Sequence, residues 1–150
     1  MRTLLIVHHT PSPPTRELLE AVIAGARDPA ITGVDVVIRP ALAATVTDAV
    51  NADAYLFGTP ANFGYMSGAL KCFFDTVYYP VLDHVAGRPY GLWVHGTNDT
   101  AGAVAAVERI CSGLGLVKSA GVLEVTRTVD AAVLDEAKNL GGTLAASLMD

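Results

Sequence analysis

The chain has 150 residues, of which 51% are hydrophobic and 17% charged, and its formal net charge is −5 at pH 7. This length supports one domain, residues 1–150, with a substantial core, and the apolar content argues against a disordered chain. The negative charge is weak evidence against binding to nucleic acid or to anionic membrane surfaces.

Apolar runs and helical patterns alternate along the chain. In chain order, the expected elements are strand 3–8, helix 16–26, strand 33–39, strand 53–60, helix 66–78, strand 89–97, helix 101–115, strand 116–125 and helix 130–149. Ser12 and Asp130 are the expected N-caps of the first and last helices. Asp28-Pro29 is expected to end the first helix, and Pro60 to stop the third strand.

This alternation predicts an α/β fold, a three-layer sandwich in which a five-stranded parallel sheet of order 2-1-3-4-5 has helices on both faces. In such sheets ligands bind beyond the carboxyl ends of the strands, near the point where the strand order reverses. The informative segments are therefore those that follow strands one, three and four, at residues 9–15, 60–65 and 95–99.

Two features bear on the cellular compartment. Cys72 and Cys111 both fall within helical patterns, which suggests small buried core residues in a reducing compartment, and no metal-site spacing is present. The apolar run 4–7 is far too short for a signal-peptide core or a membrane span. We therefore expect a cytoplasmic protein without membrane insertion.

The first loop, HHTPSPPTR, is rich in proline where a phosphate loop usually carries glycine. Pro13 and Pro14 would occupy the first helical turn and remove two of the N–H groups that a phosphate uses. Hydroxyls that could replace them belong to Thr10, Ser12 and Thr15. Arg16 adds a positive charge, and the helix dipole still favours an anion. The alternative is a well-capped helix with a stiff entry turn, and the loop alone leaves both interpretations open.

The third loop lies in the stretch GTPANFGYMSGALKCFFDTVY. An aromatic and an amide at the carboxyl edge of a sheet suit a flat heterocycle, and Gly64 permits close approach of the backbone to its ring nitrogens and oxygens. The candidate site residues here are Pro60, Ala61, Asn62, Phe63, Gly64 and Tyr65. The apolar residues of the following helix are instead assigned to the core: Met66, Leu70, Phe73, Phe74 and Val77. A purely structural turn is the alternative.

This stretch resembles the flavin loop of the flavodoxin-like NAD(P)H:quinone oxidoreductases, which has the form Pro-x-x-Phe-Gly-x-Met-(Ser/x)-Gly-x-x-Lys-x-Phe-x-Asp. The matching residues are Pro60, Phe63, Gly64, Met66, Gly68, Lys71, Phe74 and Asp75. The first loop resembles the sequence YHSxTGGTR of flavodoxin-type relatives, except that Pro13-Pro14 stand where those relatives have glycines. The resemblance implies a flavodoxin-like fold, FMN as cofactor, NAD(P)H as electron donor and a quinone or similar small molecule as acceptor.

The resemblance also assigns roles to individual loops. The implied cofactor-binding residues of the first loop are His9, Thr10, Ser12, Pro13, Pro14 and Thr15. The fourth loop, HGTNDTAG, would flank the other side of the isoalloxazine ring through His95, Gly96, Thr97, Asn98 and Asp99. Relatives have a Gly-Gly-Gln-like stretch there, and the compatible alternative is an Asx turn in which Asp99 or Thr100 caps a helix. No catalytic acid or base is implied, because the cofactor carries the redox chemistry.

Other chemistries find little support in the sequence. The four histidines have no metal-site spacing, although His9 and His95 could line the flavin pocket. Neither a Gly-x-Ser-x-Gly elbow nor a Walker loop occurs, and His8-His9 stand where a receiver domain has acidic residues. Two functional alternatives remain open: a flavodoxin-type electron carrier without substrate turnover, and a flavin-free flavodoxin-like binding module. Many relatives place two subunits around each flavin, so we expect a homo-oligomer.

Overall fold

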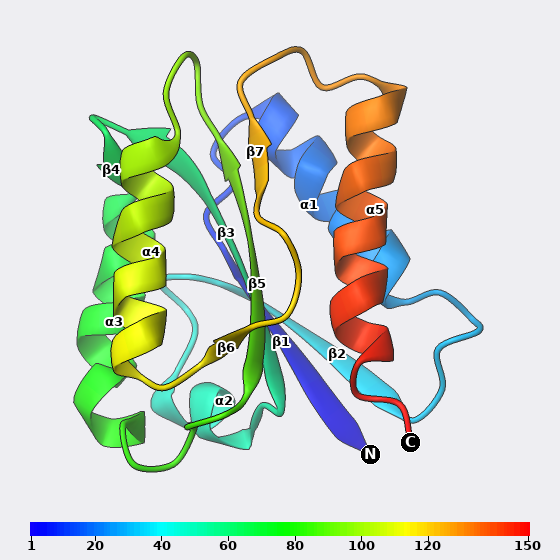
Figure 1. Cartoon of the computed structure of the whole chain (residues 1–150), viewed down its shortest axis with the longest axis vertical. Helices are drawn as coiled ribbons and strands as arrows, with labels where there is room; N and C mark the ends of the chain where they lie inside the picture. Colours follow the sequence, from blue (N-terminus) through cyan, green and yellow to red (C-terminus); the bar gives the residue numbers. More distant parts are fainter.

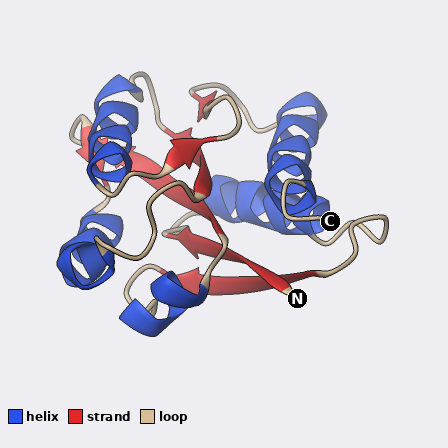
Figure 2. Ribbon diagram, turned by 60° about the horizontal axis from the view of Figure 1, so that its bottom comes forward, coloured by secondary structure: helices blue, strands red, loops and turns tan.

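The computed structural model describes residues Met1–Asp150 and places a twisted sheet between two groups of helices (Figures 1 and 2). The elements in chain order are β1 Arg2–His8, α1 Pro13–Ala26, β2 Val34–Pro40, α2 Val46–Asn51, β3 Ala54–Asn62, β4 Tyr65–Met66, α3 Gly68–Val81, β5 Pro89–His95, α4 Ala101–Gly113, β6 Val117–Lys118, β7 Leu123–Val125 and α5 Ala131–Ala146.

The parallel sheet has the strand order β2-β1-β3-β5, and both β6 and β7 pair with the free edge of β5. The predicted order 2-1-3-4-5 is therefore confirmed, with β6 and β7 sharing the fifth position. A continuous fifth strand over 116–125 was wrong, because residues 119–122 leave the ladder. That segment contains serine, alanine and glycine, which favour strands less than β-branched residues do.

Each face of the sheet has its own core. One cluster of 23 buried residues lies beneath α2, α3 and α4, and a second of 16 lies beneath α1 and α5. Side chains alternate along β1, so that Leu5 and Val7 belong to the first cluster while Leu4 and Ile6 belong to the second. This burial on both faces explains why the central strands β1, β3 and β5 are largely continuous apolar runs.

The helices α1 and α5 pack with their backbones in close contact. A Cβ atom at Gly141 would lie 2.0 Å from the Val22 carbonyl oxygen, and one at Gly25 would lie 1.8 Å from the Lys138 carbonyl oxygen. Gly25 in α1 and Gly141 in α5 therefore allow this close helix packing. Asp130 caps α5 as predicted, because its carboxylate accepts a hydrogen bond from the N–H of Val133 at 2.9 Å.

Three features near the third strand differ from expectation. The strand does not stop at Pro60 but continues to Asn62, because its last two residues pair with β4. Met66 therefore lies in β4 rather than in the helix, although it is buried in the core as expected. The helix α3 continues to Val81 through Pro80, which stands in its last turn.

Two further expectations need correction. The short helix α2 was not predicted, since six residues give almost no periodicity; its capping box of Thr45 and Asp48 is the signal that could have revealed it. Cys72 is exposed rather than buried, because it lies on the outer side of α3, whereas Cys111 is buried as expected.

Candidate functional site

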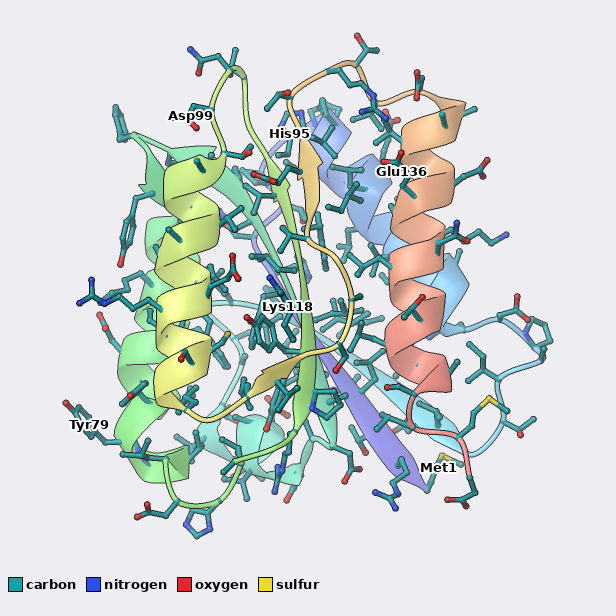
Figure 3. All side chains as sticks on the ribbon, viewed as in Figure 1. Met1, Tyr79, His95, Asp99, Lys118 and Glu136 are labelled. Carbon is teal, nitrogen blue, oxygen red and sulfur yellow. The ribbon has the colours of Figure 1, made fainter.

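The carboxyl ends of β1, β3 and β5 lie side by side. His8 is in register with Gly58, and Pro60 is in register with His95, so the first, third and fourth loops leave the sheet at neighbouring positions. Figure 3 labels His95 and Asp99 at this edge, while Met1 and Tyr79 lie toward the opposite end of the molecule. The three segments that the sequence singled out are therefore brought together.

The first loop forms a closed cap on α1. Ser12 is the N-cap, as predicted, and its Oγ accepts from the Thr15 N–H at 3.5 Å. The Thr15 hydroxyl accepts from the Ser12 N–H at 3.0 Å and donates to the Ser12 carbonyl at 2.8 Å. The Arg16 N–H bonds to that same carbonyl at 3.0 Å, and Pro13 and Pro14 have no N–H. The first turn of α1 therefore has no backbone N–H group without a protein partner.

The residues before this cap are histidines with different surroundings. His8 Nδ1 is hydrogen-bonded to the Thr10 hydroxyl at 3.1 Å, and burial, with a smaller effect of nearby His9, lowers the pKa of His8. His8 is therefore neutral at pH 7. The His9 backbone N–H donates to the Gly58 carbonyl at 2.9 Å, but its buried Nδ1 has no hydrogen-bond partner. Such an atom is what a bound ligand or water would satisfy.

The third loop is a β-hairpin. Ala61 pairs with Met66 and Asn62 with Tyr65, which leaves a two-residue tip. Phe63 and Gly64 at this tip have φ angles of 51° and 71°. Two consecutive positive φ angles are typical of a type I′ hairpin turn, and phenylalanine rarely adopts one.

The hairpin tip presents unpartnered groups. Phe63 is fully exposed, Tyr65 is 41% exposed, and the N–H groups of Phe63 and Gly64 have no partner within the protein. Exposed rings and free donors held in a strained turn make this tip a candidate for ligand contact.

Buried polar contacts hold the base of this hairpin in place. The Thr59 hydroxyl accepts from the Ser67 N–H at 2.9 Å and donates to the Pro60 carbonyl at 2.8 Å. Ser67 in turn caps α3 by accepting from the Leu70 N–H at 3.2 Å. Thr59 and Ser67 are both fully or almost fully buried, so water does not compete for these hydrogen bonds.

Glycines allow the third and fourth loops to pack together. A Cβ atom at Gly102, in the first turn of α4, would lie only 1.9 Å from the Gly64 carbonyl oxygen. A Cβ atom at Gly96 would lie 3.2 Å from the Cβ of Ala61. The hairpin and the start of α4 therefore form one continuous surface.

The fourth loop is rich in free donors. None of the four consecutive N–H groups of Thr97, Asn98, Asp99 and Thr100 has a protein partner. Thr100 is the N-cap of α4, but its hydroxyl donates to Glu124 at 2.8 Å, and the Asp99 carboxylate instead accepts from the Ala101 N–H at 2.9 Å. The expected Asx-type turn at Asp99 is thus present, and it leaves the preceding N–H groups free.

These features fit one part of a flavin better than the other. The free N–H groups of the hairpin tip and the fourth loop match the hydrogen-bond acceptors on the edge of an isoalloxazine ring, and Tyr65 offers an exposed aromatic face. Burial also lowers the pKa of His95, so that side chain is neutral at pH 7. The capped start of α1 does not offer a comparable set of donors to a phosphate. The residues present therefore fit the isoalloxazine ring of FMN, and they fit its phosphate poorly.

Trp93 does not contribute to this surface. It is buried, and its ring lies over Gly58, where a Cβ atom would be 2.0 Å from the indole. Trp93 is therefore not available to stack on a ligand.

The larger cavities lie beside or away from these loops. A groove of about 460 Å³ runs between α3 and α4 next to the hairpin and is lined by Tyr65, Lys71 and Arg109 among others. An open cavity of about 570 Å³ lies between α1 and α5. No set of three or more potential metal-ligating side chains is clustered, and none of the helices has the length and apolar character needed to span a membrane.

Comparison with known proteins agrees with this architecture. A flavodoxin from Aquifex aeolicus (strain VF5) is 31% identical over 88 residues, which cover 59% of this chain and 46% of that protein, so the match spans less than half of that relative. A flavodoxin structure from the domain Archaea has a TM-score of 0.81 at 18% identity and 97% coverage of both chains. The WrbA-like flavodoxin of Agrobacterium tumefaciens has a TM-score of 0.78 at 17% identity, with both chains covered completely.

The family comparison is more specific than the structural one. The sequence matches the family model described as NADPH-dependent FMN reductase over residues 16–128, a range that begins at Arg16, the last residue of the proline-containing loop. The chain therefore has the flavodoxin-like fold predicted from its sequence and belongs to the NADPH-dependent FMN reductase family.

Proposed function

We propose that the protein binds FMN against the third and fourth loops and transfers electrons from NAD(P)H to a quinone or similar small acceptor. Membership of the family supports a flavin-binding oxidoreductase or electron carrier in general. The observation that carries the proposal is the set of unpartnered N–H groups at Phe63, Gly64 and 97–100, on two loops that pack against each other.

In this proposal the chain acts by positioning. Bound FMN would supply the ability to accept a hydride and release electrons. The N–H groups of the two loops would donate hydrogen bonds to the ring edge, and donors fixed in advance stabilise developing negative charge without reorganisation. Tyr65 would cover part of a ring face, and the anchor of Thr59 and Ser67 would hold the hairpin still. We assign no side chain as a catalytic acid or base.

The proposal is tested by following NAD(P)H oxidation by the purified protein with added FMN and a simple quinone. We expect quinone-dependent oxidation that saturates with FMN. If no NAD(P)H is oxidised with any quinone at saturating FMN, the proposal is wrong.

A matched pair of variants ties the activity to the fourth loop. Asn98→Pro deletes one unpartnered N–H, whereas Asn98→Ala deletes only the exposed side chain. Loss of one hydrogen bond should weaken FMN binding by about fivefold in the proline variant and leave the alanine variant near wild type. Equal affinities in the two variants would argue against backbone recognition by this loop.

A flavodoxin-type electron carrier is the second candidate. The Aquifex aeolicus relative is itself named a flavodoxin, and the carboxylates of Asp99 and Glu124 lie at the fourth loop. Negative charge near the ring opposes accumulation of further charge and so favours one-electron steps. A protein that binds FMN, shows no turnover with NAD(P)H and takes up electrons one at a time would support this candidate.

We retain the expected homo-oligomer as part of the proposal. Phe63 is fully exposed and Tyr79 is 80% exposed, and both present apolar rings that a second copy could cover. Light scattering of the purified protein should give a mass of two or more chains, and a monomer at all concentrations would contradict this part of the proposal.

A further inference from the structure

We infer that the site recognises the ring end of a flavin without selecting for its phosphate, so that riboflavin is bound about as tightly as FMN. This inference rests on the proposed flavin site and deepens it by defining the class of cofactor as flavins with or without a phosphate. The observation that supports this inference is the hydrogen-bond pattern of the first loop.

The helix that follows the first strand is the usual source of backbone donors for a phosphate. The first four N–H groups of a helix normally lack partners and are available to an anion. In α1 the first two positions are Pro13 and Pro14, which have no N–H, and the N–H groups of Thr15 and Arg16 are directed to Ser12. None of the four is left for a ligand.

The hydroxyls of the loop do not replace these donors. The Thr15 hydroxyl donates to the Ser12 carbonyl, so the Ser12 hydroxyl is the donor in the 3.0 Å contact between the two side chains. Thr15 is only 3% exposed, which keeps this ring of bonds out of reach of a ligand. The Thr10 hydroxyl is bonded to His8 Nδ1, which leaves the backbone N–H of Thr10 as the one free amide between residues 9 and 15.

The charges at this edge compensate only weakly for the missing N–H donors. Arg127, in the loop after β7, is paired with Glu136 at 3.5 Å, and Asp99 and Glu124 add negative charge at the fourth loop. Arg16 is exposed on α1 and forms no ion pair, so its positive charge is free, but an exposed charge adds little to binding because water and salt screen it. The dipole of α1 remains, and an exposed helix start favours an anion by no more than about fivefold in affinity.

The contrast with α4 indicates which part of the ligand is recognised. The N–H groups of Gly102 and Ala103, in the first turn of α4, have no protein partner, and neither do those of 97–100 before them. Free donors are therefore concentrated beside the hairpin, where the ring would lie, and are almost absent where the phosphate would lie.

The test is a fluorescence titration of the purified, flavin-free protein with FMN and with riboflavin. We expect FMN to bind no more than about fivefold more tightly than riboflavin. The affinity for FMN should also change little with added salt, because few charged contacts are available to screen. A preference for FMN over riboflavin of about fiftyfold or more would require several charge-assisted hydrogen bonds to the phosphate. Such a preference would overturn the inference.

A loop variant tests the cause. Pro13→Gly/Pro14→Gly restores two N–H groups to the start of α1 and should tighten FMN binding about tenfold while riboflavin affinity stays within about threefold. Pro13→Ala/Pro14→Ala restores the same groups with less added flexibility, so it serves if the glycine variant folds poorly. An unchanged ratio of the two affinities in the folded variants would overturn the inference. If neither flavin binds the wild-type protein, the proposed function is wrong, and this inference, which rests on it, is wrong as well.

Discussion

The contact between Gly102 and Gly64 makes a sharp prediction about the proposed site. Replacing Gly102 with alanine places a Cβ atom 1.9 Å from the Gly64 carbonyl oxygen, where ordinary contact begins at 3.4 Å, so one partner must move by 1.5 Å (3.4 − 1.9). The start of α4 is backed by the buried core residues Ala103 and Val107. The hairpin tip is exposed and joined to the sheet through the two-residue strand β4, so the tip is the part that moves.

The size of the effect follows from the donors that move with the tip. Phe63 and Gly64 each present one free N–H, and a hydrogen bond contributes about 0.5–1.5 kcal/mol net, so losing both costs about 1–3 kcal/mol of binding free energy. Flavin affinity should fall between about fivefold and about 150-fold. The free energy of unfolding should change by no more than about 2 kcal/mol, because repacking at the tip is offset by the better helix propensity of alanine.

The assay is a fluorescence titration with FMN, alongside urea unfolding of the same variant. Gly68→Ala is the matched control, because Gly68 opens α3 just after the hairpin and its Cβ would have no neighbour within 4 Å. We expect Gly68→Ala to bind FMN within about twofold of wild type. If Gly102→Ala binds FMN as tightly as the control does, the hairpin and the start of α4 are not part of the flavin site.

Three further predictions concern stability and reactivity. Gly141→Ala places a Cβ atom 2.0 Å from a carbonyl oxygen of α1 and should lower the free energy of unfolding in urea by about 1–3 kcal/mol. The nearest contact of a Cβ atom at Gly142 is 3.4 Å, so Gly142→Ala should instead raise the free energy of unfolding by up to about 1 kcal/mol. Equal stabilities of the two variants would refute this packing. Burial lowers the folded-state pKa of His8 and His95 below the ordinary value of 6.5, so the unfolded chain binds more protons and stability is lost as pH falls below that value. In the double variant His8→Gln/His95→Gln, the free energy of unfolding should fall less than in wild type as the pH is lowered. An equal fall in the variant and in wild type would contradict this prediction. In the native protein a thiol reagent should label exposed Cys72 alone among the two cysteines, and rapid labelling of both would show that the other is accessible.

The largely apolar central strands β1, β3 and β5 made the sheet predictable from the sequence. Their runs reflect burial on both faces, and their alternation with helices left few possible topologies. The elements that escaped prediction are short: α2 has six residues and β4 has two, too few to show a period. The hairpin was also hidden because its tip is Phe63-Gly64 rather than the Asn-Gly that usually indicates a type I′ turn.

The site was predictable in position but not in its hydrogen bonds. The loops were located by the rule that parallel strands end at a common edge, and the register of β1, β3 and β5 brings them together. The sequence did not reveal that the Ser12 and Thr15 hydroxyls bond to each other, because capping boxes usually have glutamate or glutamine at the third position rather than threonine. A count of hydrogen-bond donors made from the sequence includes groups, such as these two hydroxyls, that already form hydrogen bonds within the folded protein.

Flavin binding at the third and fourth loops can be tested most directly by hydrogen exchange of the backbone amides with and without FMN. We expect saturating FMN to slow exchange at Phe63, Gly64 and 97–100, whose amides have no partner within the protein, while the amides at the start of α1 change little. Saturable flavin binding that protects the cavity between α1 and α5, or no site at all on these two loops, would contradict it.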